Sequence, residues 1–246
     1  MMKIAYIHRK SSTLIGTCCF GLLLLFGAAS CGKDEEVAPS YVDGKSTVIY
    51  DLAGDTEASM GTSVGNGKEN RSFQTFLFRL RDRRQIWIKT KADSLQYLQT
   101  NDWDIAFTGP YNSEIFLNNA NDIFNPGYQG PATKTAVIVV PQAYETVVTA
   151  PSDAEFDSST IGKIGVALSN ESSGWFQYNN NTHIMIALTN RTYILRLPDG
   201  KYAKLQLINA YKGNPTTVTN MNWPAPYYTF RYYVQQDGSK NLDTSE

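Results

Sequence analysis

The sequence predicts an all-β protein built mainly from antiparallel strands, with a few short helices. Short apolar or alternating runs recur along the chain between turn residues, whereas long helical periodicity is nearly absent. Aromatic residues make up 12% of the chain, including 15 tyrosines, and aromatic side chains favour strands. Together these features indicate a β-rich fold.

The clearest strand pattern lies in residues 174–235. Apolar and polar residues alternate through 193–197 and again through 202–208. The Pro-Asp-Gly sequence at 198–200 separates the two runs, because proline presets φ and glycine accepts a positive φ. We therefore expect a β-hairpin here, followed by a further aromatic strand that ends near Gln236.

Shorter runs predict the remaining strands. On the run 103–107, Trp103, Ile105 and Phe107 are expected to share one face. Pro141 either ends the run before it or places that run at a sheet edge. One helical turn is expected at 94–100, and the Asn-, Gly- and Pro-rich segment 118–133 is expected to be a surface loop. The full set of additional strands expected is 47–52, 73–80, 85–89, 103–107, 114–118 and 136–140.

Residues 1–30 are expected to be a signal peptide, which is not part of the fold. A basic start precedes an apolar run at 14–29, which is too short for a stop-transfer helix. Small residues at 28–30 stand directly before Cys31, which is typical of a bacterial lipoprotein signal. The alternative is an ordinary secretory signal with a chance cysteine.

Cysteine usage favours the lipoprotein interpretation. Cys18 and Cys19 lie in the expected signal peptide, so Cys31 would be the only cysteine after cleavage. A lone thiol has no disulfide partner in an exported protein, and acylation, for instance with palmitate, accounts for it. We expect lipidation at Cys31 and attachment to the membrane through this anchor only.

The domain organisation follows from that assignment. Residues 31–44 are expected to be the lipidated cysteine and a flexible tether, 45–237 a single β domain and 238–246 a C-terminal tail. The charged residues 33–36 resemble the surface-export signal of lipoproteins in Bacteroidetes-type bacteria, although charge runs are also simple solvated tethers. We expect an outer-membrane lipoprotein exposed at the cell surface.

The composition and motifs argue against several function classes. A formal net charge of −1 gives no basic field for nucleic acid. His183 is the only histidine after the signal peptide, no nucleophile elbow occurs, and zinc ligands are lacking. Neither a phosphate-binding glycine loop nor positioned paired carboxylates are evident. The protein is therefore not expected to be an enzyme.

Two side chains remain as candidates for binding a cofactor. Histidine and methionine both serve as axial ligands of haem iron. His183 and Met185, at i and i+2, would point to one face of a strand, too close to clasp a haem from both sides. Only one of them is expected to ligate, and both also fit ordinary structural roles. Tyr178, Tyr128 and Met60 are candidates for a second contact.

Several segments resemble the HmuY family of haem-binding lipoproteins of Bacteroidetes. They are WDIAF at 103–107, GWFQY at 174–178, and RTYILR at 191–196 with DGKYAK at 199–204. The resemblance covers the chain from Cys31 to its C-terminus. It implies a single HmuY-like all-β domain that acts as a haemophore, taking haem from host haemoproteins and delivering it to a TonB-dependent receptor.

The haem ligands implied by the resemblance do not match residue by residue. The founding member of the family uses two histidines, one well before the Gly-Trp motif and one shortly after it. Here residues 176–181 contain no histidine, and residues 142–156 contain neither histidine nor methionine. Other relatives use methionine, which keeps Met185 a candidate. A lipoprotein of the same fold that binds another tetrapyrrole, a protein partner or a glycan, the last at Trp223 and Tyr227, is the alternative.

Overall fold

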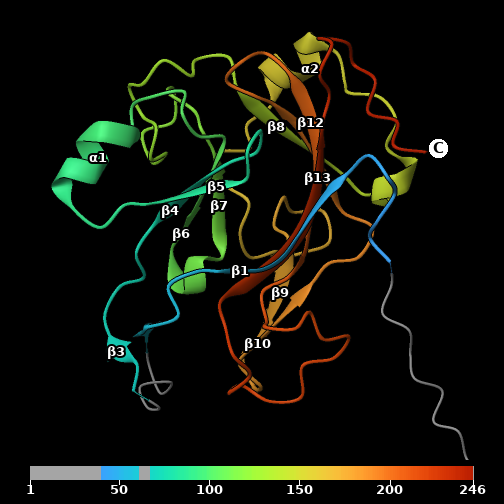
Figure 1. The fold of residues 1–246 in the computed structure, drawn as a ribbon. Helices are drawn as coiled ribbons and strands as arrows, with labels where there is room; N and C mark the ends of the chain where they lie inside the picture. The colour runs from blue at the N-terminus through green and yellow to red at the C-terminus, as the bar shows by residue number, and fades with distance from the viewer. Residues whose placement is uncertain (1–39, 61–66, 246) are drawn as a thin grey trace, which may run out of the picture. The chain divides into compact units, whose positions relative to one another are not determined.

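The structure is a computed structural model that describes residues 40–60 and 67–245. The expected signal peptide, Cys31 and most of the tether lie outside the described residues. Most strands pair antiparallel, and the two largest sheets pack on each other (Figure 1). Within the described ranges, no helix has the length and apolar character needed to cross a membrane.

The larger sheet has five strands and confirms the predicted hairpin. β11 pairs with β12, and Gly200 in the connecting turn has a φ of 82°. β13 continues the sheet as the predicted aromatic strand, and β8, which precedes Pro141, lies at an edge. The strand order is β1 (Thr47–Ala53), β13 (Tyr227–Val234), β12 (Tyr202–Asn209), β11 (Thr192–Arg196) and β8 (Ala136–Val140).

The second sheet has four antiparallel strands, close to the predicted positions. Their order is β5 (Arg84–Trp87), β4 (Phe76–Arg79), β6 (Ile105–Thr108) and β7 (Glu114–Leu117). Two small sheets complete the strands. They are the antiparallel pair β9 (Phe176–Asn179) and β10 (Ile184–Ala187), and the parallel pair β2 (Ala58–Ser59) and β3 (Glu69–Asn70).

The main core lies between the two large sheets. Phe78 of β4 meets Phe230 of β13 edge to face at 5.4 Å between ring centroids, and Phe107 meets Tyr228 at 4.9 Å. The Tyr232 hydroxyl donates to the carbonyl of Leu80 across the same interface, at 2.7 Å. The aromatic rings therefore fill the space between the sheets, while the tyrosine hydroxyls find partners at its border.

The outer faces of the sheets are also partly covered, which explains why the strands are apolar on both faces. Leu77, Ala106 and Phe116 point to the outer face of the four-stranded sheet and pack with Trp103. Trp103 thus does not share a face with Ile105 and Phe107, contrary to the expectation. β6 begins only at Ile105, so strand alternation does not reach Trp103.

Two short α-helices lie outside the sheets, and both differ from the predictions. α1 (Lys91–Tyr97) begins three residues before the expected turn, after a capping box between Thr90 and Asp93. α2 (Asp153–Ser158) forms where no helix was expected, and a capping box between Ser152 and Glu155 starts it. The remaining helical turns are η2 (Pro110–Asn112) and η3 (Tyr144–Thr146).

Residues 238–245 belong to the segment that was expected to be a C-terminal tail. They pack against the five-stranded sheet. Leu242 is fully buried, and Thr244 accepts a hydrogen bond from the ammonium of Lys204 at 3.0 Å. The same ammonium donates to the carbonyls of Tyr144 and Val147 at 3.1 and 3.0 Å. Burial lowers the pKa of Lys204 to about 8. Three acceptors thus hold a buried lysine that joins η3 to the C-terminal segment.

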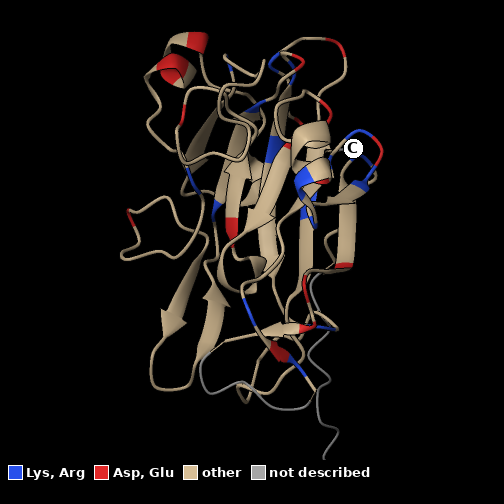
Figure 2. Cartoon of the chain, turned by 90° about the vertical axis from the view of Figure 1, so that its left-hand side faces the viewer, with Lys and Arg blue, Asp and Glu red and all other residues tan. Residues whose placement is uncertain are grey.

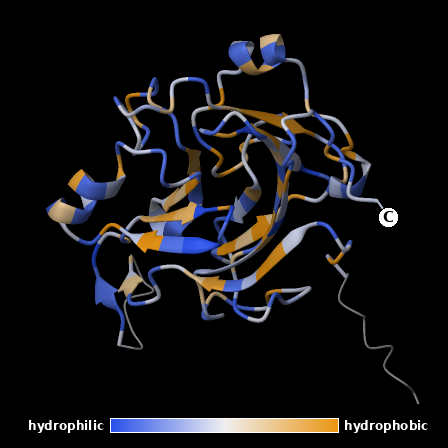
Figure 3. Ribbon diagram, turned by 45° about the horizontal axis from the view of Figure 1, so that its top comes forward, coloured by the Kyte–Doolittle hydropathy of each residue, from blue (hydrophilic) through white to orange (hydrophobic). Residues whose placement is uncertain are grey.

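Charge and hydropathy follow this layering. Hydrophobic segments recur along the strands in Figure 3, while the connecting segments are largely hydrophilic. Positive and negative residues are interspersed along the chain in Figure 2, in keeping with the net charge of −1. In this view segments of the two signs lie intermixed.

Candidate functional site

The β9–β10 hairpin carries both residues singled out for binding a cofactor, and it lies at the lower end of the molecule in Figure 1. His183 was expected on a strand. It is instead the last residue of the connecting turn, with a φ of 57°. Its amide donates to the carbonyl of Asn179 at 2.8 Å, and the Asn179 side chain accepts from the amides of Asn181 and Thr182. This Asx-type turn presents the His183 side chain to solvent.

The His183 ring is held by one neighbour. Its Nδ1 atom lies 2.9 Å from the hydroxyl of Tyr178, which is itself 43% exposed. A hydroxyl both donates and accepts, so in the Nδ1–H tautomer its oxygen accepts the hydrogen bond from Nδ1 and the Nε2 lone pair is free. Metal-ligating histidines are oriented by this kind of hydrogen bond at the second nitrogen.

Met185 lies deeper in the hairpin than His183. It pairs directly with Tyr178 across the two strands, and its amide donates to the hydroxyl of Tyr211 at 2.9 Å. Its side chain is half-buried and packs against apolar residues of two clusters, one of which includes Trp223. Met185 is therefore partly engaged in packing, whereas His183 is exposed.

Tyrosine side chains surround the hairpin. Burial raises the pKa of Tyr211, and the nearby hydroxyls of Tyr178 and Tyr111 raise it further. Tyr111 has a φ of 53°; its carbonyl accepts a hydrogen bond from Tyr228 at 2.7 Å, and its ring lies 4.7 Å from that of Phe73. These contacts fix Tyr111 although its backbone conformation is unfavourable for a non-glycine residue.

We call His183, Met185, Tyr178, Tyr211 and Tyr111 the hairpin site. At this site the His183 imidazole and the Tyr178 ring are exposed, the Met185 thioether and the Tyr111 ring are half-buried, and Tyr211 is buried. Imidazole, thioether and phenolate all serve as axial ligands of haem iron, and aromatic side chains suit its planar ring. The residues present therefore fit a haem-type ligand.

The candidates for a second contact are separated by the fold. Tyr178 shares a side with His183, since the two side chains are hydrogen-bonded. Loop 118–133, which includes Tyr128, lies at the upper end of Figure 1, away from the hairpin. Met60 is 44% exposed and follows β2, whose partner β3 lies at the lower end. Met60 is therefore the one candidate of the three that lies at the hairpin's end of the molecule and outside the hairpin itself.

The alternative glycan residues are engaged within the protein. The Trp223 indole donates to the carbonyl of Lys212 at 3.0 Å. The Lys212 ammonium lies 5.3 Å above the ring of Tyr227. Both aromatic side chains are half-buried. They do not form the exposed platform that the sequence suggested.

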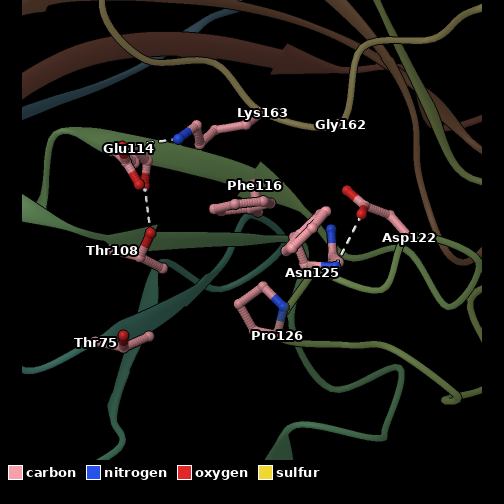
Figure 4. A pocket seen from close by; sticks show the side chains of 10 residues that line it. Thr75, Thr108, Glu114, Phe116, Asp122, Asn125, Pro126, Gly162 and Lys163 are labelled. Atoms are coloured by element: carbon pink, nitrogen blue, oxygen red, sulfur yellow. Dashed lines mark hydrogen bonds and ion pairs between the residues drawn. The ribbon is translucent and has the colours of Figure 1, made fainter.

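Two pockets lie away from the hairpin site. One, of about 620 Å³, lies on the outer face of the four-stranded sheet and is lined by Phe116, Phe124 and Glu114 among others (Figure 4). The other, of about 570 Å³, is bordered by Arg196, whose guanidinium is bound to Asp157 at 2.6 Å. Neither His183 nor Met185 lines these two pockets.

A metal centre needs several ligating side chains, and a hydrolase triad needs a nucleophile beside its histidine. In the described residues, no group of three or more His, Cys, Asp or Glu residues is arranged to hold a metal ion. The hydrogen bond of the His183 ring joins it to a tyrosine, and not to the serine or carboxylate of a hydrolase triad.

Comparisons with known proteins return structures only. No family model and no curated protein matches the sequence. The structure is similar to that of the apo HmuY analog of Tannerella forsythia, with a TM-score of 0.41 and 14% identity, over 78% of this chain and 96% of that chain. It is also similar to apo PinO from Porphyromonas gingivitis, with a TM-score of 0.36 and 12% identity, over 78% and 97%.

A third similar structure is described as an HmuY-like heme binding protein from Bacteroides vulgatus, with a TM-score of 0.36 and 14% identity, over 77% of this chain and 91% of that chain. Two of these structures are named as HmuY-like or as an HmuY analog. The strands of this chain are mainly antiparallel, which is the predicted all-β class.

Proposed function

We propose that the protein is a lipid-anchored, non-catalytic binding protein that captures haem at the hairpin site and passes it to a TonB-dependent outer-membrane receptor. One observation carries the proposal: the exposed His183 imidazole is held at Nδ1 by Tyr178, beside Met185 and two further tyrosines. Such a histidine is prepared to offer Nε2 to iron.

The two candidate ligands have different roles in this proposal. His183 is exposed and oriented, so its ligation of haem iron requires no unpacking of the fold. Met185 is half-buried, so its thioether would form the wall of the site and serve as the ligand only after a local rearrangement. His183 is the first candidate and Met185 the second.

Binding without a covalent bond suits capture and delivery. The Tyr178, Tyr111 and Met185 side chains supply apolar surface for the porphyrin, and His183 adds one directional bond to the metal. Because the imidazole is at the end of a two-stranded hairpin, it stays accessible to a partner protein. Hand-off to a receptor then needs the loss of one ligand bond and of stacking contacts.

The anchor is a further part of the proposal and rests on the sequence before Cys31. We expect the mature chain to begin at Cys31, carry fatty acids and reach the outer surface of the outer membrane. Metabolic labelling with a palmitate analogue tests the lipidation, since the Cys31→Ser variant should lose the label and leave the membrane fraction. Label retained by Cys31→Ser would contradict this part.

A haem titration tests the binding function. Residues 32–246 are titrated with ferric and with ferrous haem while the Soret band is followed. A saturable shift of the Soret band in at least one oxidation state is expected. No shift in either state would refute the proposal.

Iron-free protoporphyrin IX is the matched control ligand. It retains the planar apolar ring but offers no metal for His183, so it should bind more weakly than haem. Equal affinity for the two ligands would show that iron ligation contributes nothing. The result would favour the alternative, a protein that recognises a tetrapyrrole by its ring alone.

A further inference from the structure

A pocket separate from the hairpin site lies on the outer face of the four-stranded sheet. We propose that the pocket between this sheet and the loop 122–126 binds a pyranose ring of a saccharide. The pocket has a volume of about 620 Å³, within the roughly 300–1,000 Å³ of small-molecule sites. It shares no lining residue with the hairpin site, so the two functions are independent.

The sheet supplies a polar row for the pocket. Phe76 pairs with Phe107 and Thr108 with Glu114, so Thr75, Thr108 and Glu114 lie next to one another across three strands. The alternation of side chains places Phe116 on the same face as Glu114. Figure 4 shows Phe116 between this row and the loop residues Asp122 and Pro126. The floor thus combines hydroxyls, a carboxylate and an aromatic ring.

A chain segment distant in sequence provides a cation at the rim. Ile164 forms an antiparallel bridge with Ile115, with both amide-to-carbonyl distances at 2.8 Å. This bridge places Lys163 beside β7, where its ammonium lies 2.8 Å from the Glu114 carboxylate. Lys163 and Glu114 are both partly exposed, so the pair is open to a ligand from the pocket side.

The opposite wall is a loop with a buried anchor. Asn125 is 4% exposed; its amide nitrogen donates to the carbonyl of Leu117, and its oxygen accepts from the amides of Asn119 and Gly127. The neighbouring Phe124 side chain is 84% exposed although it lines the pocket. A large exposed ring on an anchored loop is a preformed surface for a ligand.

The mixture of groups selects the ligand class. Two carboxylates, Glu114 and Asp122, disfavour a simple anion, while the Lys163 ammonium disfavours a simple cation. Sugar hydroxyls both donate and accept, so they match a site that presents both kinds of group. The C–H face of a pyranose ring packs on an aromatic side chain, and the exposed ring of Phe124 supplies such a face.

Saturation-transfer NMR tests this inference with four defined probes. They are the methyl α-pyranosides of glucose, galactose and mannose, and N-acetylglucosamine, each at millimolar concentration. We expect saturation transfer to the ring C–H protons of at least one probe, with Phe124→Ala weakening its binding about tenfold, as expected for about 1.4 kcal/mol. Asp122→Asn should weaken the same probe.

Matched controls separate the pocket from its surroundings. Ile123 is 66% exposed, adjoins Phe124 and does not line the pocket, so Ile123→Ala should leave the signal unchanged. His183→Ala should also leave it unchanged, whatever its effect on haem. No transfer to any of the four sugars, or wild-type transfer in Phe124→Ala, overturns the proposal. Transfer only to choline, included as a cationic probe, overturns it as well.

Discussion

The sandwich core and the hairpin site are both rich in aromatic side chains, but the two regions use them differently. In the core, Phe107 and Phe230 are fully buried, and the Tyr232 hydroxyl is bound to a carbonyl of the facing sheet. At the hairpin site, Tyr178 and His183 are exposed and bonded mainly to each other. The core side chains stabilise the fold, whereas the exposed pair contributes little to its stability.

This difference explains where a ligand can be accommodated. A close-packed core has no room for a ligand unless a cavity is made. Making that cavity lowers the free energy of unfolding by several kcal/mol. An exposed pair can change partners at small cost, because water already competes for its hydrogen bonds. The variants below test this contrast.

The largest effect is expected in the core. Phe107→Ala removes a fully buried ring that stacks on Phe76 at 4.6 Å and also contacts Tyr228. We expect the free energy of unfolding to fall by about 3–5 kcal/mol, as measured by urea denaturation. A loss below about 1 kcal/mol would mean that the sheets do not pack as described.

An intermediate effect is expected at the border of the core. Burial raises the pKa of Asp104 from 3.8 to about 6, although its carboxylate accepts a hydrogen bond from the Leu80 amide at 2.7 Å. The folded state therefore holds the proton more tightly than the unfolded state. The unfolding free energy should fall as the pH rises from about 4 to 6 through this group.

Asp104→Asn isolates that contribution. Asparagine keeps an acceptor for the Leu80 amide but carries no charge, so the variant should be more stable than the wild type at pH 7. The gain should be on the order of 1–2 kcal/mol, because the group is only half-buried, and should vanish near pH 4. Thermal unfolding at both pH values measures it, and a gain that is the same at pH 4 and pH 7 would contradict the titration.

The smallest effect on stability is expected at the hairpin site. Tyr178→Phe removes the hydroxyl that holds His183 but keeps the ring, so the unfolding free energy should change by no more than about 0.5 kcal/mol. Haem affinity should nevertheless fall about 10- to 100-fold, as for other partners of metal-bound histidines. Absorbance titration measures the affinity.

Tyr50 provides the control for this variant. It is an exposed tyrosine on β1, outside the hairpin site, and 54% of its surface is accessible. Tyr50→Phe should leave both stability and haem binding unchanged. An equal loss of affinity in the two variants would remove the orienting role assigned to Tyr178.

Features that depend on neighbouring residues, such as hairpin turns and helix starts, leave clear signals in the sequence. The β11–β12 hairpin followed from alternation on both sides of a Pro-Asp-Gly turn, and Gly200 has the positive φ expected of it. The capping boxes Thr90–Asp93 and Ser152–Glu155 mark the starts of both α-helices. The serine-to-glutamate spacing was a usable signal for α2 that the prediction did not apply.

The hairpin site was only partly predictable. Both ligand candidates were identified from their residue types, but His183 was expected on a strand. The Asn-Asn-Asn-Thr run at 179–182 is a turn signal, because asparagine side chains bond to nearby amides and tolerate positive φ. The positions of Tyr111 and Tyr211 beside the hairpin depend on long-range packing, which no local pattern contains.

The saccharide pocket could not be predicted from local patterns at all. Its rim depends on the bridge between Ile115 and Ile164, two residues that are far apart in the sequence. The segment 118–133 was expected to be a plain surface loop, yet Asn118 and Asn125 are buried and donate to backbone carbonyls. These amide contacts turn a polar segment into a fixed wall.

The central claim is that His183 is the residue of this chain that ligates haem iron. The most direct measurement compares the Soret and visible spectra of haem bound to wild-type protein, His183→Ala and Met185→Ala. We predict that His183→Ala loses the wild-type spectrum, while Met185→Ala retains its band positions with weaker binding. Wild-type spectra in His183→Ala, or their loss only in Met185→Ala, would contradict the claim.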